Sequence, residues 1–482
     1  MVLKGRREIF TDYTEITKEN ICEVLNDAFA DHNHNVGEIK YLQEYEKGVQ
    51  PILDRVKEVR PEINNKVVEN HAAEITAFKV GYVFGSPITF VQRANNENGV
   101  ADDKNIATLN EMMFEENKQA QDQALGKDLA VCGVGYRIVL PKRVVTGVSA
   151  FDLIKLNPQT TFVVKGNDIY RKPLLGVSYA ISKDGKEKHI GAYTDKYYFE
   201  ITGDVDSFKV IRVEANMLGM IPIIEYVNDN ERMGSFERVL PLLDALNVAT
   251  SDRLNGLAQF VQSILWMNNC EIDSEQMEQL KDKMGLLTKS EQGNPASVQY
   301  LTATLDQSQT QTLIDYLYEQ VLQIAGVPGR EQSSGGNTGQ AIMLSNGWQI
   351  AETHARSMEQ IFSCSEREML KVVLRILQTT NVASLKLSDI DIKFSRNKTD
   401  SLIVKTQGLL NQLQAGIHPL VAITHCGLYS DPQGVWNDSK DYLGKWLYEA
   451  DEEEDVVEES VSTYRQSGGE DNQDIAPSVS AE

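Results

Sequence analysis

The stretch GREQSSGGNTGQAIML, residues 329–344, combines glycines with small polar residues and leads into an apolar run. Backbone N–H groups at the junction between such a loop and a helix can bind an anion such as a phosphate. A Walker loop also needs a Lys for the phosphates and a Ser or Thr for magnesium directly after its last glycine. Here Gln340 and Ala341 follow Gly339, and the dinucleotide pattern G-x-G-x-x-G is absent. The residue types therefore argue against a nucleotide site in this loop.

The residues on both sides of the loop predict helices. Before it, Ile314, Leu317, Val321 and Ile324 recur at intervals of three and four residues, which is a helical period. After it, apolar and small residues alternate at intervals of four and three, which predicts one helix of about 40 residues, about 60 Å long at 1.5 Å per residue. The positions in this stripe are Leu344, Trp348, Ala351, Ala355, Met358, Phe362, Ser365, Met369, Val372 and Ile376.

The spacing of the stripe does not say what covers it. A helix of this length, with a narrow stripe of partly small residues, is expected to pack against neighbouring subunits rather than on a core of its own. A core within the subunit, or a coiled-coil seam, produces the same spacing. In each case the long helix is a rigid support for the glycine-rich loop.

The charge balance limits how the protein can treat nucleic acid. The chain has 482 residues, enough for the core of two to four domains, with 47 basic and 70 acidic side chains and a net charge of −23. Residues 451–482 carry eleven acidic residues against one Arg, a net of −10, which leaves −13 for the rest. Tight binding of DNA needs clusters of Lys and Arg. No such cluster is present in the sequence, so we expect no DNA clamp, although a surface that DNA slides past stays open.

Several other classes of protein are disfavoured. The five cysteines are scattered and lack C-x-x-C spacing, which predicts a reduced cytoplasmic setting without structural zinc. We expect no signal peptide after Met1 and no membrane span, because no stretch of 18 uncharged apolar residues occurs. The group Asp31, His32 and His34 favours a solvated polar turn over a metal site. No nucleophile elbow G-x-S-x-G is present, and we expect no catalytic residue, cofactor or metal.

The first half of the chain predicts helices followed by strands. Residues 15–60 read as two or three helices, broken at 34–37 and near 48–51. A helix from about Val68 should end at Gly81, a strand should follow Pro87, and 104–126 should form an amphipathic helix. From residue 130 to about 227 the period changes toward two, which predicts a mainly antiparallel β region. The sequence KDGK at 183–186 is a hairpin signal within it.

The second half is mainly helical, so the fold class is α+β. A helical stripe runs from Phe236 to about Trp266 and is followed by an α/β insertion at 268–306. In that insertion we expect an acidic helix at 274–283 and strands around a Gly293-Asn294-Pro295 turn. Then come a helix at 307–325, the long helix, a strand at 390–394 and a small helical unit at 401–448. The acidic C-terminal stretch is expected to be disordered.

Four segments, in their order along the chain, resemble portal proteins of tailed bacteriophages, the head-to-tail connectors common in long-tailed phages of Gram-positive hosts. The resemblance covers roughly residues 15–445. The set is more specific than any one motif in it. The segments are YLQEYEKGVQPIL at 41–53, NKVVENHAAEITAFKVGYVFGSPITF at 65–90, IPIIEYVNDNERMGSFERVLPLLDALNVATSD at 221–252 and SGGNTGQAIML at 334–344.

The resemblance implies a division of the chain into named parts. The β-rich wing would cover 1–235, together with the long helix and return strand at 341–397. The two stem helices would be 236–267 and 307–328, separated by the clip at 268–306. The tunnel loop would be 329–340, the crown 398–450 and the disordered acidic tail 451–482.

The resemblance also implies sites and partners. The subunit would form a ring, a dodecamer, that binds the terminase large subunit, head-completion and tail adaptors, and scaffolding and major capsid proteins, while double-stranded DNA passes through. ATP hydrolysis would belong to the terminase. Alternatives are a monomeric scaffold or adaptor and a packaging ATPase. The residues expected to face DNA are Arg330, Glu331, Gln332, Ser333, Ser334, Gly335, Gly336, Asn337, Thr338 and Gln340, and which of them reach it is left open. Those expected to dock partners at the clip are Glu271, Asp273, Glu275, Glu278, Lys281, Lys283, Lys289 and Gln299.

Overall fold

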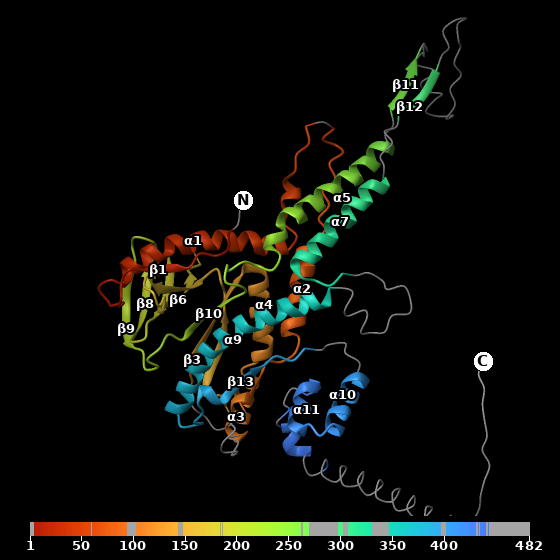
Figure 1. Cartoon of the computed structure of the whole chain (residues 1–482). Coiled ribbons are helices and arrows are strands. Elements are labelled where there is room, and N and C mark those ends of the chain that lie inside the picture. Colours follow the sequence, from red (N-terminus) through yellow and green to blue (C-terminus); the bar gives the residue numbers. More distant parts are fainter. Residues whose placement is uncertain are drawn as a thin grey trace, which may run out of the picture. The chain divides into compact units, whose positions relative to one another are not determined.

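The computed structural model describes most of the chain, in two compact units, Met1–Lys398 and Thr399–Glu482 (Figure 1). The fold class is α+β, as the sequence predicts. The described residues are 4–58, 60–93, 103–142, 148–183, 185, 187–261, 264–268, 297–301, 307–329, 347–396, 402–429, 432, 434–439 and 442.

A six-stranded sheet forms one part of the first unit, in the order β1-β5-β6-β7-β8-β9. All neighbours in it are antiparallel except β1 and β5, which confirms the mainly antiparallel region. β6 and β7 pair directly across the predicted KDGK turn. The strands are β1 (Ile9–Thr11), β5 (Thr161–Gly166), β6 (Pro173–Ile181), β7 (Lys188–Tyr193), β8 (Tyr197–Gly203) and β9 (Lys209–Ala215).

Helix α1, Ile21–Glu46, packs on this sheet as one unbroken helix, so the predicted break at 34–37 is wrong. Gly37 lies inside it with no atom within 4 Å of where its Cβ would stand, and a single exposed glycine costs a helix only about 1 kcal/mol. His32 is buried, and its Nε2 lies 3.1 Å from the Tyr179 hydroxyl. Burial lowers the pKa of His32 to about 4. The group around it is therefore not a solvated turn.

A second, three-stranded sheet has the order β10-β3-β4 and is antiparallel throughout. Its strands are β3 (Val134–Pro141), β4 (Phe151–Leu156) and β10 (Ile223–Val227). The helices α2 (His71–Phe84), α3 (Asp103–Glu115) and α4 (Lys118–Cys132) share a core with it. The predicted helix end at Gly81 is wrong, because α2 continues to Phe84. The single helix predicted at 104–126 is divided at Asn117, whose φ is 52°.

The long helix α9, Trp348–Thr379, packs across β10 and β3 (Figure 1). The predicted stripe positions from Ala351 onward are buried, apart from the half-buried Ser365. Ala355, Met358, Phe362, Met369, Val372 and Ile376 belong to one core cluster with residues of the same chain. The expectation that this stripe packs neighbouring subunits is therefore wrong, because the subunit's own sheet and helices cover it.

A buried ion cluster, Lys118, Asp122, Arg137 and Glu366, fixes α9 to α4 and β3. Lys118 Nζ lies 2.6 Å from Asp122 Oδ2 and 3.2 Å from Glu366 Oε2, and Arg137 Nη1 donates to Glu366 Oε1 at 2.8 Å. The Tyr226 hydroxyl of β10 donates to the same Glu366 oxygen at 2.9 Å. Two cations and two carboxylates balance each other, which allows four charges to be buried together.

Helices α5 (Leu240–Val261) and α7 (Gln307–Ala325) lie side by side in Figure 1, and a hairpin of β11 (Ile264–Asn268) and β12 (Ser297–Leu301) continues from their ends. The bounds of α7 confirm the predicted helix. The predicted helical stripe to Trp266 is wrong beyond Val261, because 264–268 form a strand. Spacing cannot separate helix from strand in a run this short. The acidic helix predicted at 274–283 lies outside the described residues.

Strands β2 (Thr89–Gln92) and β13 (Ile390–Lys393) pair antiparallel and confirm the two strands expected there. Short 3-10 helices lie at η1 (Pro51–Asp54), η2 (Glu237–Val239) and η3 (Leu387–Asp389). The second unit contains α10 (Leu402–Gln414) and α11 (Pro419–Cys426). The acidic stretch 451–482 lies outside the described residues.

Candidate functional site at the root of the glycine-rich segment

The residues predicted to face DNA, 330–340, lie outside the described part of the chain. So do the predicted docking residues Glu271 to Lys289, while the backbone of Gln299 lies in β12. The structure does describe the elements that carry both segments. These elements are the C-terminal end of α7, the N-terminal end of α9 and the α5–α7 pair.

The C-terminal end of α7 is a Schellman motif that fixes where the chain leaves the helix. The N–H of Val327 donates to the Leu322 carbonyl at 2.9 Å, and the N–H of Gly326 donates to the Gln323 carbonyl at 3.2 Å. Val327 and Leu322 are both buried, as the motif requires. Gly326 has φ of 64°, and a Cβ there would lie 2.7 Å from His354 Nδ1. Only glycine fits at this exit point.

A buried lysine binds the same exit point from the side. Lys79 of α2 is 8% exposed, and its Nζ donates to the Gly326 carbonyl at 3.2 Å. Burial lowers the pKa of this ammonium group to about 8. A cation suits this position, because the last carbonyls of a helix carry partial negative charge. Lys79 therefore joins α2 to the root of the glycine-rich segment.

The N-terminal end of α9 is held next to this exit point. Gly347, with φ of 76°, precedes Trp348, and a Cβ on Gly347 would lie 3.7 Å from the Pro328 Cα. The Trp348 ring lies 6.1 Å from Phe78 and 5.8 Å from Tyr82, two stacked aromatic residues of α2. The segment between Gly329 and Gly347 therefore leaves and returns at adjacent points on a packed base.

A cavity of about 360 Å³ lies beneath this root and is lined from α2, α7, α9 and residues 228–239. His354 and Arg238 line it together with Lys79. Burial, and the positive charges of Lys79 and Arg238, lower the pKa of His354. Arg238 is itself paired with Asp229 at 2.9 Å and Glu231 at 2.7 Å. The charge of Lys79 on the cavity wall therefore affects the pKa of His354 on the same wall.

The α5–α7 pair is anchored in the body by its lower part. Leu243 and Leu246 of α5 share a buried core with Val321 and Leu322 of α7 and with α1 and α2 residues. Tyr45 of α1 also donates from its hydroxyl to Asp244 at 2.8 Å. The same core therefore supports the α5–α7 pair and the root of the glycine-rich segment.

A polar ladder on α5, made of Asn247, Ser251 and Asn255, binds the extended chain at 65–69. Their side-chain oxygens accept from the backbone N–H groups of Glu69 (2.8 Å), Val67 (2.9 Å) and Asn65 (2.7 Å). All three side chains are fully buried. Four residues of a helix rise about 6 Å and two residues of an extended chain about 6.6 Å. The spacing of the ladder residues on α5 therefore matches the spacing of alternate N–H groups in the segment 65–69. The ladder is not among the sites predicted from the sequence, although polar residues at every fourth position on one helix face were a signal for it.

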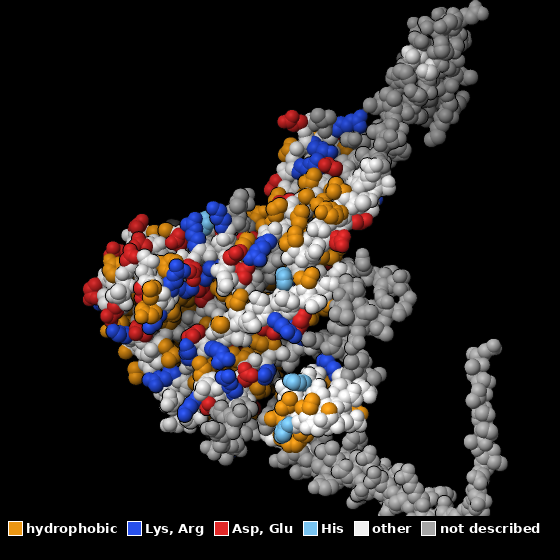
Figure 2. All heavy atoms as spheres, in the orientation of Figure 1, with side chains coloured by type: hydrophobic (Ala, Val, Ile, Leu, Met, Phe, Trp, Pro, Cys, Tyr) orange, Lys and Arg blue, Asp and Glu red, His pale blue; other side chains and the backbone are white. Residues whose placement is uncertain are grey.

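The outer part of the α5–α7 pair leaves large apolar side chains in solvent. We call Leu254, Leu257, Leu313 and Tyr316 the exposed apolar strip. Their exposed fractions are 42%, 47%, 51% and 57%. Figure 2 shows apolar side chains gathered over these two helices. Apolar side chains that gather on a surface in this way are a feature of interaction sites.

The described contacts hold both ends of the glycine-rich segment and the α5–α7 pair on one packed base. The described residues hold no group of side chains with the composition of a metal site. None of the described helices is long and apolar enough to cross a membrane. A family model described as phage portal protein, SPP1 Gp6-like, matches residues 25–454, which include the root, the α5–α7 pair and α9. No curated protein matches the chain.

Proposed function

Because this chain belongs to the family of SPP1 Gp6-like phage portal proteins, we propose that its copies form a closed ring, a dodecamer, at one vertex of the capsid. DNA enters the capsid through the centre of the ring during packaging and leaves through it during ejection. The family is structural, and the ATP hydrolysis that drives packaging is assigned to a terminase partner.

The parts of the subunit take their roles from this assignment. The α5–α7 pair is the stem, and the β11–β12 hairpin belongs to the clip. The two sheets with α1 to α4 and α9 form the wing, and the second unit is the crown. Segment 329–340, held between α7 and α9, is the tunnel loop that faces DNA.

The exposed apolar strip is the observation that most directly supports the proposal of a ring. A closed ring needs heterologous interfaces, in which one face of a subunit meets a different face of the next. The stripe on α9 cannot supply that interface, because it is buried within the subunit. Full burial of one leucine contributes about 1.5–3 kcal/mol, so burial of several half-exposed apolar residues at each interface contributes favourably to assembly.

Charge substitutions on the strip test this proposal. Leu257→Asp combined with Leu313→Asp should convert rings to monomers, as measured by solution mass and by negative-stain images. Ile169→Asp is the matched control, because Ile169 is 92% exposed and lies outside the α5–α7 pair. A native chain that stays monomeric at every protein and salt concentration would contradict the ring and favour the adaptor alternative. ATP hydrolysis by the purified chain would favour the packaging ATPase.

The clip role is tested by shortening the hairpin without disturbing the stem. Asn268 of β11 pairs with Ser297 of β12, so a two-residue Asn-Gly turn can join them directly in place of residues 269–296. This variant removes seven of the predicted docking residues, Glu271, Asp273, Glu275, Glu278, Lys281, Lys283 and Lys289. It should still form rings but fail to bind terminase or adaptors. Normal packaging by this variant would show that docking lies elsewhere.

A further inference from the structure

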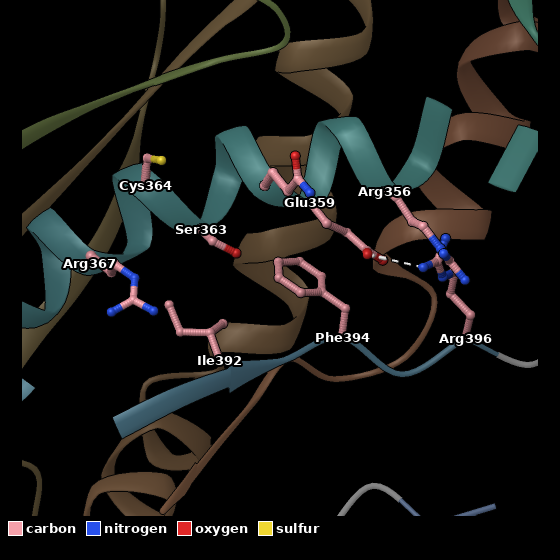
Figure 3. Close-up of a pocket in the computed structure, with 9 residues that line it drawn as sticks. Arg356, Glu359, Ser363, Cys364, Arg367, Ile392, Phe394 and Arg396 are labelled. Atoms are coloured by element: carbon pink, nitrogen blue, oxygen red, sulfur yellow. Dashed lines mark hydrogen bonds and ion pairs between the residues drawn. The ribbon is translucent and has the colours of Figure 1, made fainter. Parts of the chain in front are cut away.

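A groove of about 480 Å³ lies between α9 and residues 392–396, which comprise the end of β13 and the three residues after it (Figure 3). One wall is a flank of α9, and the other is apolar apart from Arg396. The α9 wall carries Arg356, Gln360, Ser363, Cys364 and Arg367, and the opposite wall carries Ile392 and Phe394.

The groove is basic on a chain that is strongly acidic overall. Three arginines line it, Arg356, Arg367 and Arg396, against one carboxylate, that of Glu359. Arg396 is neutralised, because it lies 2.9 Å from Glu352 and 3.0 Å from Glu359. Arg356 binds Glu352 through its Nε at 2.9 Å, and Arg367 has no carboxylate partner among the described residues. The groove therefore offers cationic hydrogen-bond donors that are not used within the described part of the subunit.

The two-stranded sheet beside the groove has a closed edge on β2 and an open edge on β13. On β2, the side chain of Asn110 accepts from the Phe90 N–H at 3.1 Å and donates to the Phe90 carbonyl at 2.8 Å, so it takes the place of a further strand. Ile392 lies opposite Phe90 in the antiparallel pair. Because both backbone groups of Phe90 bind Asn110, these two residues form a pair without hydrogen bonds between them, so the Ile392 carbonyl points away from β2. No strand among the described residues pairs with that edge of β13. An edge of this kind can bind an extended peptide.

We propose that this groove binds the acidic run Asp451–Glu459 of a second copy of the chain as an extended strand. That run, DEEEDVVEE, has seven carboxylates in nine residues and no basic residue, which makes it the strongest charge complement in the sequence. Val456 and Val457 interrupt the carboxylates and point to opposite sides of an extended strand, so Val456 can face the apolar wall of Ile392 and Phe394 while Val457 faces α9. The proposal rests on the proposed function only in requiring that copies lie side by side.

The dimensions of groove and run agree. Arg356 and Arg367 are eleven positions apart on α9, which is about 16 Å along a helix axis. An extended strand covers about 13 Å in four residues, and the long arginine side chains can span the remaining difference. Asp455 and Glu459 are four residues apart, so they lie on the same face of such a strand, on either side of Val457. One strand can therefore bring a carboxylate to each arginine, and bonds of this charged kind are the stronger class of hydrogen bond.

The native Cys364 lines the groove and provides the test. One full-length copy keeps Cys364, and a second, distinguishable by its tag, carries Cys364→Ser and Val457→Cys. Both carry Ser at Cys22, Cys270 and Cys426. Mild oxidation of the mixed ring should yield a disulfide between the two differently tagged chains. The copy with Val479→Cys in place of Val457→Cys is the matched control and should give at least about tenfold less of this product.

Substitutions in the groove complete the test. Arg367→Glu should lower the cross-linked fraction about tenfold, Arg367→Lys should restore most of it, and Lys371→Glu, an exposed cation on the same helix, should leave it unchanged. Equal cross-linking from positions 457 and 479, or none from either, would overturn the proposal. A further variant keeps Cys364 and carries Val457→Cys on the same chain; a disulfide that forms only within single chains of this variant would overturn the assignment to a second copy. Solution mass of the same samples reports ring formation separately, so failure of the ring and failure of the groove are distinguishable.

Discussion

The guanidinium of Arg137 on β3 donates to the carboxylate of Glu366 on α9 across 2.8 Å, with both side chains fully removed from solvent. The two residues are far apart in the sequence. Arg137 also binds Asp122 of α4, and Glu366 also binds Lys118 of α4. The pair therefore sets the position of α9 along the sheet as well as its orientation. Since α9 begins at the root of the glycine-rich segment, this buried contact also fixes where that segment returns to the body.

Removing Glu366 should strongly destabilise the subunit. Glu366→Leu leaves Arg137 and Lys118 buried with one carboxylate between them, and loss of one partner of a buried pair costs about 3–5 kcal/mol. Glu368→Leu is the control, because Glu368 is exposed on the same helix and pairs with the exposed Lys371. Urea unfolding at fixed protein concentration measures both. A loss below about 1 kcal/mol for Glu366→Leu would contradict the role given to the cluster.

The polar ladder predicts a smaller loss. Ser251→Ala removes the acceptor of the Val67 N–H and leaves a buried donor without its partner, at a cost of about 1–3 kcal/mol. Val248→Ala, at an exposed position on the same helix outside the ladder, should change the free energy of unfolding by less than about 0.5 kcal/mol. Hydrogen exchange of the Val67 amide provides a second measurement, because its protection should fall in Ser251→Ala alone. Unchanged protection there would show that the bond does not hold the 65–69 segment.

The end of α7 predicts which glycine is essential. Gly326→Ala places a Cβ 2.7 Å from His354 Nδ1 at φ of 64°, so it should cost about 1–3 kcal/mol. Gly329→Ala is the matched control, since nothing lies within 4 Å of its Cβ position and its φ is not in the left-handed region. Adding His354→Ala should recover only the part of the loss due to the close contact. Equal melting temperatures for the two single variants would contradict the Schellman assignment.

Lys79 predicts a pH dependence with a definite sign. Burial lowers its pKa from 10.5 to about 8, so between these values the unfolded chain binds more protons than the folded one. The free energy of unfolding therefore gains from this group as pH rises through that window, on the order of 3 kcal/mol in all. Lys79→Met removes the gain, so the native chain should gain stability relative to this variant as pH rises from 8 to 10.5. Lys40→Met, an exposed lysine of α1, should show no such trend, and a flat difference for Lys79→Met would contradict the lowered pKa.

The sequence predicted the elements with clear periodicity and turn signals. The bounds of α7, the β6–β7 hairpin and the buried face of α9 all follow from residue spacing and turn chemistry. Spacing shows which face is apolar but not what covers it. For that reason the spacing alone favours packing of the stripe from Ala351 to Ile376 against other subunits, although β3, β10 and α2 cover it.

Long-range polar contacts escaped prediction because each partner alone is unremarkable in the sequence. Lys118 and Asp122 are one helical turn apart, a spacing that is equally typical of an exposed ion pair, and only the structure shows that they are buried beside Arg137 and Glu366. The strand at 264–268 was missed because it continues the apolar spacing of α5. At the candidate site, the sequence predicted the two helices beside the glycine-rich segment, but not Lys79 or the contact of Gly326 with His354.

The proposed tunnel loop gives the last prediction. The segment that contains this loop leaves and rejoins the packed base at adjacent points, Gly329 and Gly347, and the predicted contact residues of the loop include neutral Asn337, Thr338 and Gln340 but no lysine. Changing these three to Lys would place a band of cations around the duplex in the ring. Each new phosphate contact strengthens binding in a salt-dependent way, so DNA should stall during packaging, most strongly at low salt.

Rings should still form, because neither the exposed apolar strip nor the buried ion cluster is changed. Lys at Gln473, Ser478 and Ser480 adds the same charge in the C-terminal segment and should leave packaging normal. The measurement is the length of packaged DNA at matched ring yield and several salt concentrations. Full-length packaging by the loop variant at every salt concentration would show that the segment does not face DNA.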